Sequence, residues 1–323
     1  EGTDARAARR DNRRDFFEAF TTASAIAGGF GLVAKANPAL AQTAPSDGDI
    51  LNFALNLEYL EAQFYVQAAT GQGLPENLLG GTGVRGQATG GRRVNFTDPV
   101  VAQYAREIAA DELAHVAFLR QALGGAAVAQ PIIDIGTAPT GAFSSAARAA
   151  GLVGPGQSFD AYATDENFLL AAYIFEDVGV TAYKGASPLI SNKTFLEAAA
   201  GILAVEAYHA SLVRTVLFAK GMQTPSLIDA TEAISDARDS LDGSDDRDQG
   251  VRQRSTIVGP GSNIAPLDQD GLAYSRSAGQ VLNIGTGRQV ANEELVAMAE
   301  RVSGRRYGDD DEIDRALRIL ADH

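Results

Sequence analysis

The feature that most constrains the fold of this chain is a repeated pattern of glutamate, tyrosine and histidine. Two of the three histidines follow a glutamate by three positions, and two other segments, LEYLEAQFY and FEDVGVTAY, carry a glutamate followed seven positions later by a tyrosine. Residues at these spacings share one face of an α-helix. The chain is therefore two copies of one unit, Glu-x6-Tyr and then Glu-x-x-His. The copies are Glu58, Tyr65, Glu112, His115 and Glu176, Tyr183, Glu206, His209.

Apolar periodicity and capping signals predict a helix around each part of the repeat. Asp47 or Asp49 is expected to cap the first helix, and Thr97 or Asp98 followed by Pro99 is a good start for the second. The four helices are predicted over residues 49–70, 99–123, 165–185 and 193–220, within a bundle domain of residues 45–221. The Gly-rich stretch 71–97 is expected to be a long surface loop, and residues 126–163 a long crossover.

This order of elements predicts an all-α fold. Four helices with one long connection between helices 2 and 3 make the ferritin-like arrangement of the four-helix bundle. Residues 222–323 are expected to form a partly irregular C-terminal extension. It would hold a solvated acidic linker (235–250), a segment that packs back on the bundle (274–284) and two short amphipathic helices (292–302 and 309–321).

The repeat places carboxylates on core-facing stripes, where solvated charge does not belong. Glu112 and His115 continue the stripe of Ile108 and Leu119, for example. Bridging carboxylates offset the repulsion between two divalent cations, and four carboxylates with two imidazoles make such a site nearly neutral and able to be buried. The predicted ligands of two Fe or Mn ions are Glu58, Glu112, His115, Glu176, Glu206 and His209.

Several alternatives remain at the level of single residues. Glu61 shares a face with Glu58 and is a rival ligand, but the tyrosine spacing of Glu58 matches that of Glu176. Glu107 and Asp111 are expected to be solvated neighbours. Each Glu-x-x-His taken alone is also compatible with a surface helix. Tyr65 and Tyr183 are either hydrogen-bonded partners of the metal ligands or plain core tyrosines.

Composition excludes several classes of function. The net charge of −14 argues against nucleic acid as a partner, since phosphate binding needs a basic surface. The chain has no cysteine, which excludes disulfides, thiolate metal sites and cysteine nucleophiles. No Walker loop, nucleophile elbow or dinucleotide-binding glycine motif is present.

The N-terminal segment is typical of a twin-arginine export signal. RRDFF (residues 13–17) precedes a mildly apolar run of residues 19–34, and Ala39-Leu40-Ala41 matches a small-x-small cleavage pattern. Residues 1–41 are thus expected to be either a cleaved signal or a retained N-terminal helix that contacts a membrane or an assembly. A periplasmic or cell-envelope location follows from the signal.

The segments ILNFALNLEYLEAQFY, DELAHVAFLRQAL, AAYIFEDVGVTAY, LAVEAYHASLVRT and SRSAGQVLNI resemble the ferritin-like domain of the desiccation-related, stress-associated proteins. The resemblance covers residues 49–220 and 272–284. It implies that Glu58 and Glu176 are single ligands, that the two Glu-x-x-His motifs supply paired ligands, and that Tyr65 and Tyr183 support them. The long loops and the C-terminal extension depart from the ferritins and argue against a ferritin-type cage.

Two classes of function follow. The first is an oxidoreductase in which two Fe or Mn ions react with dioxygen or peroxide, as a ferroxidase or a peroxide-consuming enzyme. The second is a non-enzymatic envelope, assembly or desiccation-protective protein that uses the bundle as a scaffold. The expected partners are metal ions and dioxygen or peroxide, and a homo-oligomer is left open.

Overall fold

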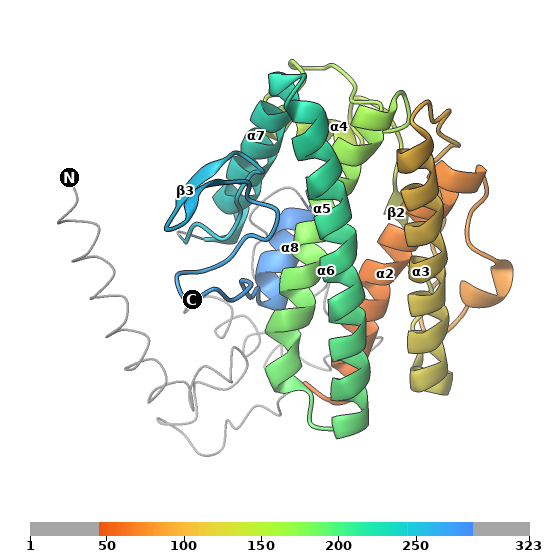
Figure 1. The fold of residues 1–323 in the computed structure, drawn as a ribbon. Coiled ribbons are helices and arrows are strands. Elements are labelled where there is room, and N and C mark those ends of the chain that lie inside the picture. The colour runs from red at the N-terminus through yellow and green to blue at the C-terminus, as the bar shows by residue number, and fades with distance from the viewer. Residues whose placement is uncertain (1–44, 244, 287–323) are drawn as a thin grey trace.

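A computed structural model describes residues 45–243 and 245–286, and it is an all-α bundle as predicted (Figure 1). Four long helices form the body: α2 (Asp47–Thr70), α3 (Pro99–Leu123), α5 (Asp165–Ala186) and α6 (Lys193–Gly221). Short 3-10 turns lie at Glu76–Leu78, Gly124–Ala126 and Ser187–Leu189. The expected N-terminal signal in residues 1–41 and the two expected helices at 292–302 and 309–321 lie outside the described residues.

The helices begin at residues whose side chains satisfy free backbone N–H groups. The first helix is capped by Ser46, not by Asp47 or Asp49, in a capping box in which Asp49 accepts from the Ser46 backbone N–H. Asp98 caps α3 with Pro99 in the first turn, and Thr164 caps α5. Short polar residues therefore set these helix starts, as their sequence positions suggested.

Contacts between the helices fix their directions. Asn52, near the start of α2, donates to the Ala126 carbonyl just after α3, so α2 and α3 are antiparallel. Tyr65 contacts Glu176 while Tyr183 contacts Glu58, which makes α2 and α5 antiparallel as well. Helices α3 and α5 therefore run in the same direction, and the segment between them is a crossover along the bundle.

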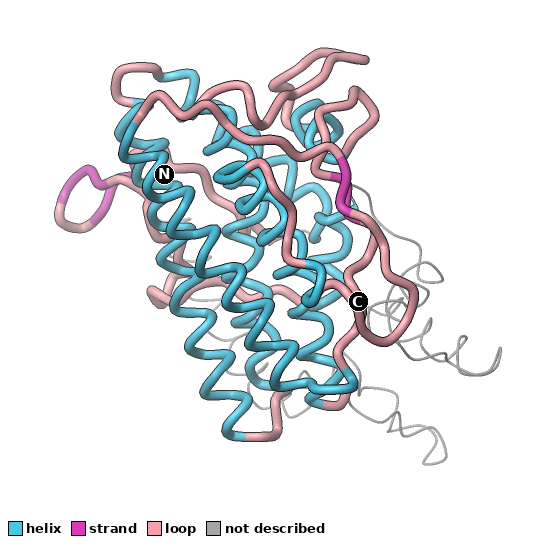
Figure 2. The backbone as a smooth tube through the Cα atoms, turned by 90° about the vertical axis from the view of Figure 1, so that its right-hand side faces the viewer, coloured by secondary structure: helices cyan, strands magenta, loops and turns pink. Residues whose placement is uncertain are grey.

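The two long loops pack against each other on the outside of the helices (Figure 2). Strand β1 (Ala88–Thr89) in the first loop pairs in parallel with β2 (Ile133–Asp134) in the crossover. Glycines allow this close approach, because a Cβ at Gly86 would overlap the backbone of Ile132 and one at Gly90, whose φ is 83°, would overlap Gly136. The Gly-rich loop therefore packs closely against the crossover.

The crossover also contributes to the aromatic core. Its short helix α4 (Ala142–Ala149) places Phe143 against Phe64 of α2, with ring centroids 5.3 Å apart. Tyr162, further along the crossover, lies 5.7 Å from the same ring, and Phe168 of α5 stacks on it at 5.5 Å. This cluster joins the crossover to the helices on both sides of it.

The C-terminal extension packs onto the bundle. Helix α7 (Pro225–Asp242) follows α6, and a small hairpin, β3 (Arg254–Thr256) with β4 (Gly259–Gly261), projects from the body (Figure 2). Helix α8 (Ala278–Thr286) buries Val281 against Val178 and Ala182 of α5. The expectation that residues 274–284 return to the bundle is confirmed.

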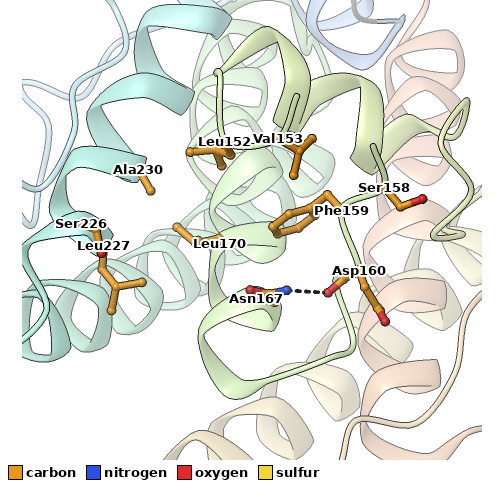
Figure 3. A pocket seen from close by; sticks show the side chains of 10 residues that line it. All are labelled: Leu152, Val153, Ser158, Phe159, Asp160, Asn167, Leu170, Ser226, Leu227 and Ala230. Carbon is orange, nitrogen blue, oxygen red and sulfur yellow. Dashed lines mark hydrogen bonds between the residues drawn. The ribbon is translucent and has the colours of Figure 1, made fainter. Parts of the chain in front are cut away.

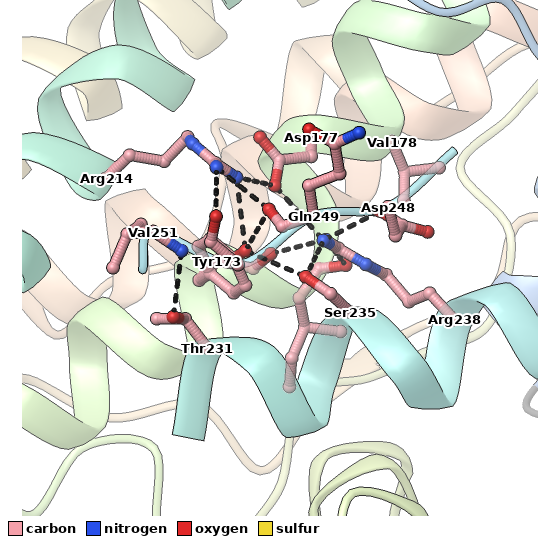
Figure 4. Close-up of polar contacts among 12 residues, drawn as sticks. Tyr173, Asp177, Val178, Arg214, Thr231, Ser235, Arg238, Asp248, Gln249 and Val251 are labelled. Atoms are coloured by element: carbon pink, nitrogen blue, oxygen red, sulfur yellow. Dashed lines mark hydrogen bonds and ion pairs between the residues drawn. The ribbon is translucent and has the colours of Figure 1, made fainter. Parts of the chain in front are cut away.

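Residues 247–277, here called the strap, are held by three buried arginines, two of which, Arg214 and Arg238, are shown in Figure 4. Arg214 of α6 pairs with Asp177 at 2.7 Å and donates to the carbonyls of Gln249, Gly250 and Asn263 in the strap. Arg238 of α7 pairs with both Asp177 and Asp248. This network ties α5, α6 and α7 to the strap.

The third arginine, Arg276, closes the network at the other end of the strap. It pairs with Asp242 at 2.7 Å and with Asp248, and donates to the Thr181 hydroxyl. Because Ser235, Arg238, Asp242 and Asp248 are all buried, the expectation of a solvated linker over residues 235–250 is wrong for these side chains. Three arginines balance three aspartates, which allows a charged segment to be buried.

Candidate metal centre

The structure brings all six predicted site residues together between the four long helices. Each helix pair contributes one single glutamate and one Glu-x-x-His, and none of the six side chains faces the solvent. The exposed fraction is 8% for His115 and at most 2% for the other five residues, Glu58, Glu112, Glu176, Glu206 and His209. A surface-helix interpretation of the Glu-x-x-His motifs is therefore excluded.

One group of side chains surrounds the His115 imidazole. Its Nδ1 lies 3.2 Å from Glu58 Oε2, 3.5 Å from Glu112 Oε2 and 3.6 Å from Glu206 Oε1. One donor atom from each of these four residues lies within 4.8 Å of the others. Carboxylate and imidazole donors at this mutual distance are able to bind a single divalent ion.

A second group surrounds His209. Glu176, Glu206 and His209 also offer donor atoms within 4.8 Å of one another, so Glu206 belongs to both groups. His209 Nδ1 lies 2.8 Å from Glu112 Oε1 without the alignment of a hydrogen bond, while Nε2 lies 3.2 Å from Asp111 Oδ2. Asp111, expected to be a solvated neighbour, is thus a partner of His209.

The two tyrosines cross between the halves of the repeat. The Tyr65 hydroxyl donates to Glu176 Oε1, and the Tyr183 hydroxyl donates to Glu58 Oε1. Both tyrosines are buried. The exchange relates the two halves by an approximate twofold axis through the centre, and it gives the Glu-x6-Tyr spacing a structural role: each tyrosine orients the single glutamate of the other half.

Many of the polar atoms that meet in this centre have no hydrogen-bond partner. Both carboxylate oxygens of Glu112 and of Glu206, Glu176 Oε2 and His209 Nδ1 are buried and unpaired. Buried polar atoms nearly always have a partner, and burying a carboxylate without one is costly. The convergence of unpaired carboxylate and imidazole donors fits metal binding better than it fits a plain core.

Burial and mutual repulsion shift the pKa values of the carboxyls upward in the protein alone. Burial raises the pKa of Glu112 and Glu206 well above the ordinary value, and the negative charges of the neighbouring glutamates add to it. Burial also raises the pKa of Glu176 to about 8, although the hydrogen bond from Tyr65 opposes the shift. These carboxyls therefore hold protons at neutral pH unless a cation replaces them.

Two groups shift in the other direction. Burial would raise the pKa of Glu58, but the hydrogen bond and the charge interaction with His115 outweigh it and hold the pKa below the ordinary value. Burial lowers the pKa of His209 despite the nearby Asp111 carboxylate. A neutral imidazole is the form that binds a metal.

Glu61 lies in the same centre as Glu58. It is 4% exposed, and burial followed by the charges of Glu58 and Glu176 raises its pKa well above the ordinary value. The choice between Glu58 and Glu61 made from the sequence was therefore incomplete, because both carboxylates reach the interior. The i, i+3 spacing of the two residues was the signal that both share the buried face.

Two other features of the described residues do not belong to this centre. An open groove of about 410 Å³ between the crossover, α5 and α7 is lined by Leu152, Phe159, Leu227 and neighbouring side chains, and shares no residue with the centre (Figure 3). In the acidic group of Asp239, Asp242 and Asp248, the last two residues pair with Arg238 and Arg276, and Asp239 accepts from the backbone N–H groups of Arg247 and Asp248.

Helix α6, which carries Glu206 and His209, is the one helix of the described residues that is long and apolar enough to cross a membrane by length and composition alone. A core helix of a soluble protein passes the same test. The burial of its glutamate and histidine among three other helices agrees with such a core position.

Comparisons with known proteins agree with this geometry. The chain is 30% identical over 249 residues to the desiccation-related protein PCC13-62 of Craterostigma plantagineum, which covers 72% of this chain and 75% of that protein. It is 27% identical over 251 residues to the ferritin-like catalase Nec2 of Nesocodon mauritianus, covering 74% and 78%. No solved structure matches significantly. The ferritin-like domain family matches residues 46–219, and the chain therefore belongs to the ferritin-like domain family.

Proposed function

We propose that the chain binds two manganese or iron ions between its four helices and uses them to consume hydrogen peroxide. The observation that carries this proposal is the convergence of four glutamates and two histidines whose buried donor atoms are largely unpaired. Four carboxylates balance the charge of two divalent ions. The name of the Nesocodon relative, a ferritin-like catalase, supports peroxide as the substrate.

The ligands divide between two positions. Glu58 and His115 belong to one position and Glu176 and His209 to the other, in keeping with the two groups of donor atoms. Glu206 belongs to both groups, and the two oxygens of Glu112 lie near different histidines, at 3.5 Å from His115 and 2.8 Å from His209. Glu112 and Glu206 are the proposed bridging carboxylates.

The remaining polar side chains prepare the ligands. Asp111 accepts a hydrogen bond from the Nε2–H group of His209, which leaves the Nδ1 lone pair directed toward the centre. Tyr65 and Tyr183 each hold one oxygen of a single glutamate, which leaves the other oxygen of that carboxylate for a metal. These contacts fix the protonation and the orientation of the donors before an ion binds.

Burial selects a small substrate. The proposed ligands are at most 8% exposed, and this burial favours a small substrate over a large organic one. Hydrogen peroxide is about the size of two water molecules. Two redox-active ions held by these ligands would pass two electrons from one molecule of hydrogen peroxide, which is oxidised to dioxygen, to a second, which is reduced to two waters.

Metal analysis and a peroxide assay test the proposal. Protein purified without added metal should contain close to two manganese or iron ions per chain and release dioxygen from hydrogen peroxide. The variant His209→Ala should lose both properties, and Glu197→Gln, an exposed change on the same helix, should keep both. Wild-type protein that holds no transition metal after reconstitution with Mn²⁺ and Fe²⁺ refutes the proposal.

A structural role in desiccation is the second candidate, favoured by the name of the Craterostigma relative. A scaffold protein would protect a test enzyme during drying whether or not the metal ligands are intact. The His115→Ala, His209→Ala double variant separates the two functions, since a metal enzyme loses its activity and a scaffold keeps its protective effect.

We also propose export by the twin-arginine route, which carries folded proteins. Arg13 and Arg14 in the sequence RRDFF support this proposal. Replacing both arginines by lysine should retain the protein in the cytoplasm of a bacterial host, with unchanged metal content. Equal amounts of wild type and variant in the periplasmic fraction would contradict export by this route.

A further inference from the structure

The two halves of the repeat differ at one position inside the centre. Three residues after Glu58 the first half carries Glu61, and three residues after Glu176 the second half carries Gly179. Both positions face the interior, because the spacing of three keeps a residue on the face of its single glutamate. The approximate twofold symmetry of the ligand set is therefore broken by one carboxylate on α2 that has no counterpart on α5.

The missing side chain of Gly179 leaves space that carboxylates fill. A Cβ at this position would lie 2.6 Å from Glu206 Oε2 and 3.2 Å from Glu61 Oε1. These two oxygens, from α6 and α2, thus lie within 3.2 Å of the same point on α5. A glycine inside a helix is less stable than an alanine, so its presence here needs a packing reason, and the carboxylates provide one.

Glu112 and Glu206 face both histidines' groups of donors, so each group has four residues before Glu61 is counted. Glu61 Oε1 lies beside Gly179, one turn after Glu176 on α5, and near the same point as Glu206 Oε2. Its carboxylate therefore lies next to the group of Glu176, Glu206 and His209. Glu176 Oε2 and both oxygens of Glu206 in that group are buried and have no hydrogen-bond partner, so these atoms are free to bind a metal ion.

We propose that Glu61 is a seventh metal ligand, which adds a carboxylate to the Glu176, Glu206, His209 position and makes the two metal positions chemically different. This inference rests on the proposed two-metal centre. Five carboxylates carry one negative charge more than two divalent ions neutralise, and that surplus lies at the position of Glu61. The position is thereby suited to the ion that carries the higher positive charge.

Titration of metal-free protein with Mn²⁺, followed by electron paramagnetic resonance of the free ion, tests the inference. Wild type should bind two ions. Glu61→Gln should bind one Mn²⁺ ion with the affinity of wild type. It should bind the second ion with an affinity at least about tenfold lower, because one charged ligand is lost. Gly179→Ala should lower the affinity for the same ion, since its methyl group displaces the carboxylates of Glu61 and Glu206. Circular dichroism establishes that each variant is folded.

Glu107→Gln, on the exposed face of α3, serves as the control and should bind like wild type. If Glu61→Gln binds both ions with affinities within about tenfold of wild type, Glu61 is not a ligand, and the two-metal centre stands without it. If Gly179→Ala leaves the affinities for both ions unchanged, the assignment of Glu61 to the second position is wrong. A wild type that binds no Mn²⁺ removes the two-metal proposal itself, so the two failures are distinguishable.

Discussion

Replacing Glu176 by glutamine should stabilise the metal-free protein, and the gain should increase with pH. Burial raises the pKa of this carboxyl from an ordinary value of 4.5 to about 8. Between these values the unfolded chain releases a proton that the folded chain retains, so the stability that this group contributes is complete below pH 4.5 and is lost as the pH rises through 8. Glutamine is neutral at every pH, and it still offers an oxygen to the Tyr65 hydroxyl.

The size of the effect follows from the shift. Each pH unit is worth 1.36 kcal/mol, so the advantage of Glu176→Gln should be near zero at pH 4.5, on the order of 3 kcal/mol at pH 7 and on the order of 5 kcal/mol above pH 8. At roughly 2–4 °C per kcal/mol, the melting temperature at pH 7 should rise by about 6–12 °C. With metal present, Glu176→Gln should instead lower the melting temperature, because the variant loses a proposed metal ligand.

Thermal unfolding in the presence of a chelator, measured by circular dichroism at pH 5, 7 and 8.5, checks this prediction. Glu197→Gln provides the control for removing an exposed carboxylate from the same protein, and its midpoint should stay close to wild type at all three pH values. A Glu176→Gln midpoint that is equal to wild type at pH 8.5 would refute the conclusion that the carboxyl is buried without compensation in the metal-free state.

Three further predictions follow from the site and the strap. Chelation should lower the melting temperature of the metal-loaded wild type, and a double variant, His115→Ala with His209→Ala, should lose most of this difference in a thermal scan because each change removes one nitrogen ligand. Arg214→Met should destabilise the fold by about 3–5 kcal/mol in urea denaturation, since it leaves Asp177 short of one partner, whereas Arg252→Met, which breaks an exposed ion pair, should cost about 1 kcal/mol or less. Gly185→Ala should expose the strap to limited proteolysis, because a Cβ there overlaps the Arg276 carbonyl, and an unchanged cleavage rate would contradict that packing.

Local signals were enough to predict the helices and the residues that meet between them. Asp98 with Pro99, for example, marked the start of α3 through chemistry contained in two neighbouring residues. The Glu-x6-Tyr spacing placed Glu58 and Tyr65 on one face of α2, and periodicity alone directed that face to the core. The same reasoning favoured Glu58 over Glu61, although a wide buried face admits both carboxylates.

Contacts between distant segments were not predictable in this way. The charged residues after Ser235 have the composition of a solvated linker, and nothing near them in the sequence reveals that Arg238 meets Asp177 or that Arg276 meets Asp242. Burial of a charge depends on a partner that only the fold supplies. Asp111 is 42% exposed, as a solvated neighbour would be, but its contact with His209 on another helix was not predictable from the residues around it.

Because the strap follows the four long helices in the sequence, its contacts with them form after the helices have been synthesised. Arg214 is synthesised about 60 residues before Arg276, and at 5–20 residues per second roughly 3–12 s separate the two events. Until the strap emerges, Arg214 has none of the three carbonyls that it later binds, and the outer face of α5 and α6 stays open. The bundle is therefore closed from its C-terminal side after the four long helices have been made. An ion that enters before this moment meets a four-helix bundle in which Arg214 still lacks its strap carbonyls, and one that arrives later meets the finished fold.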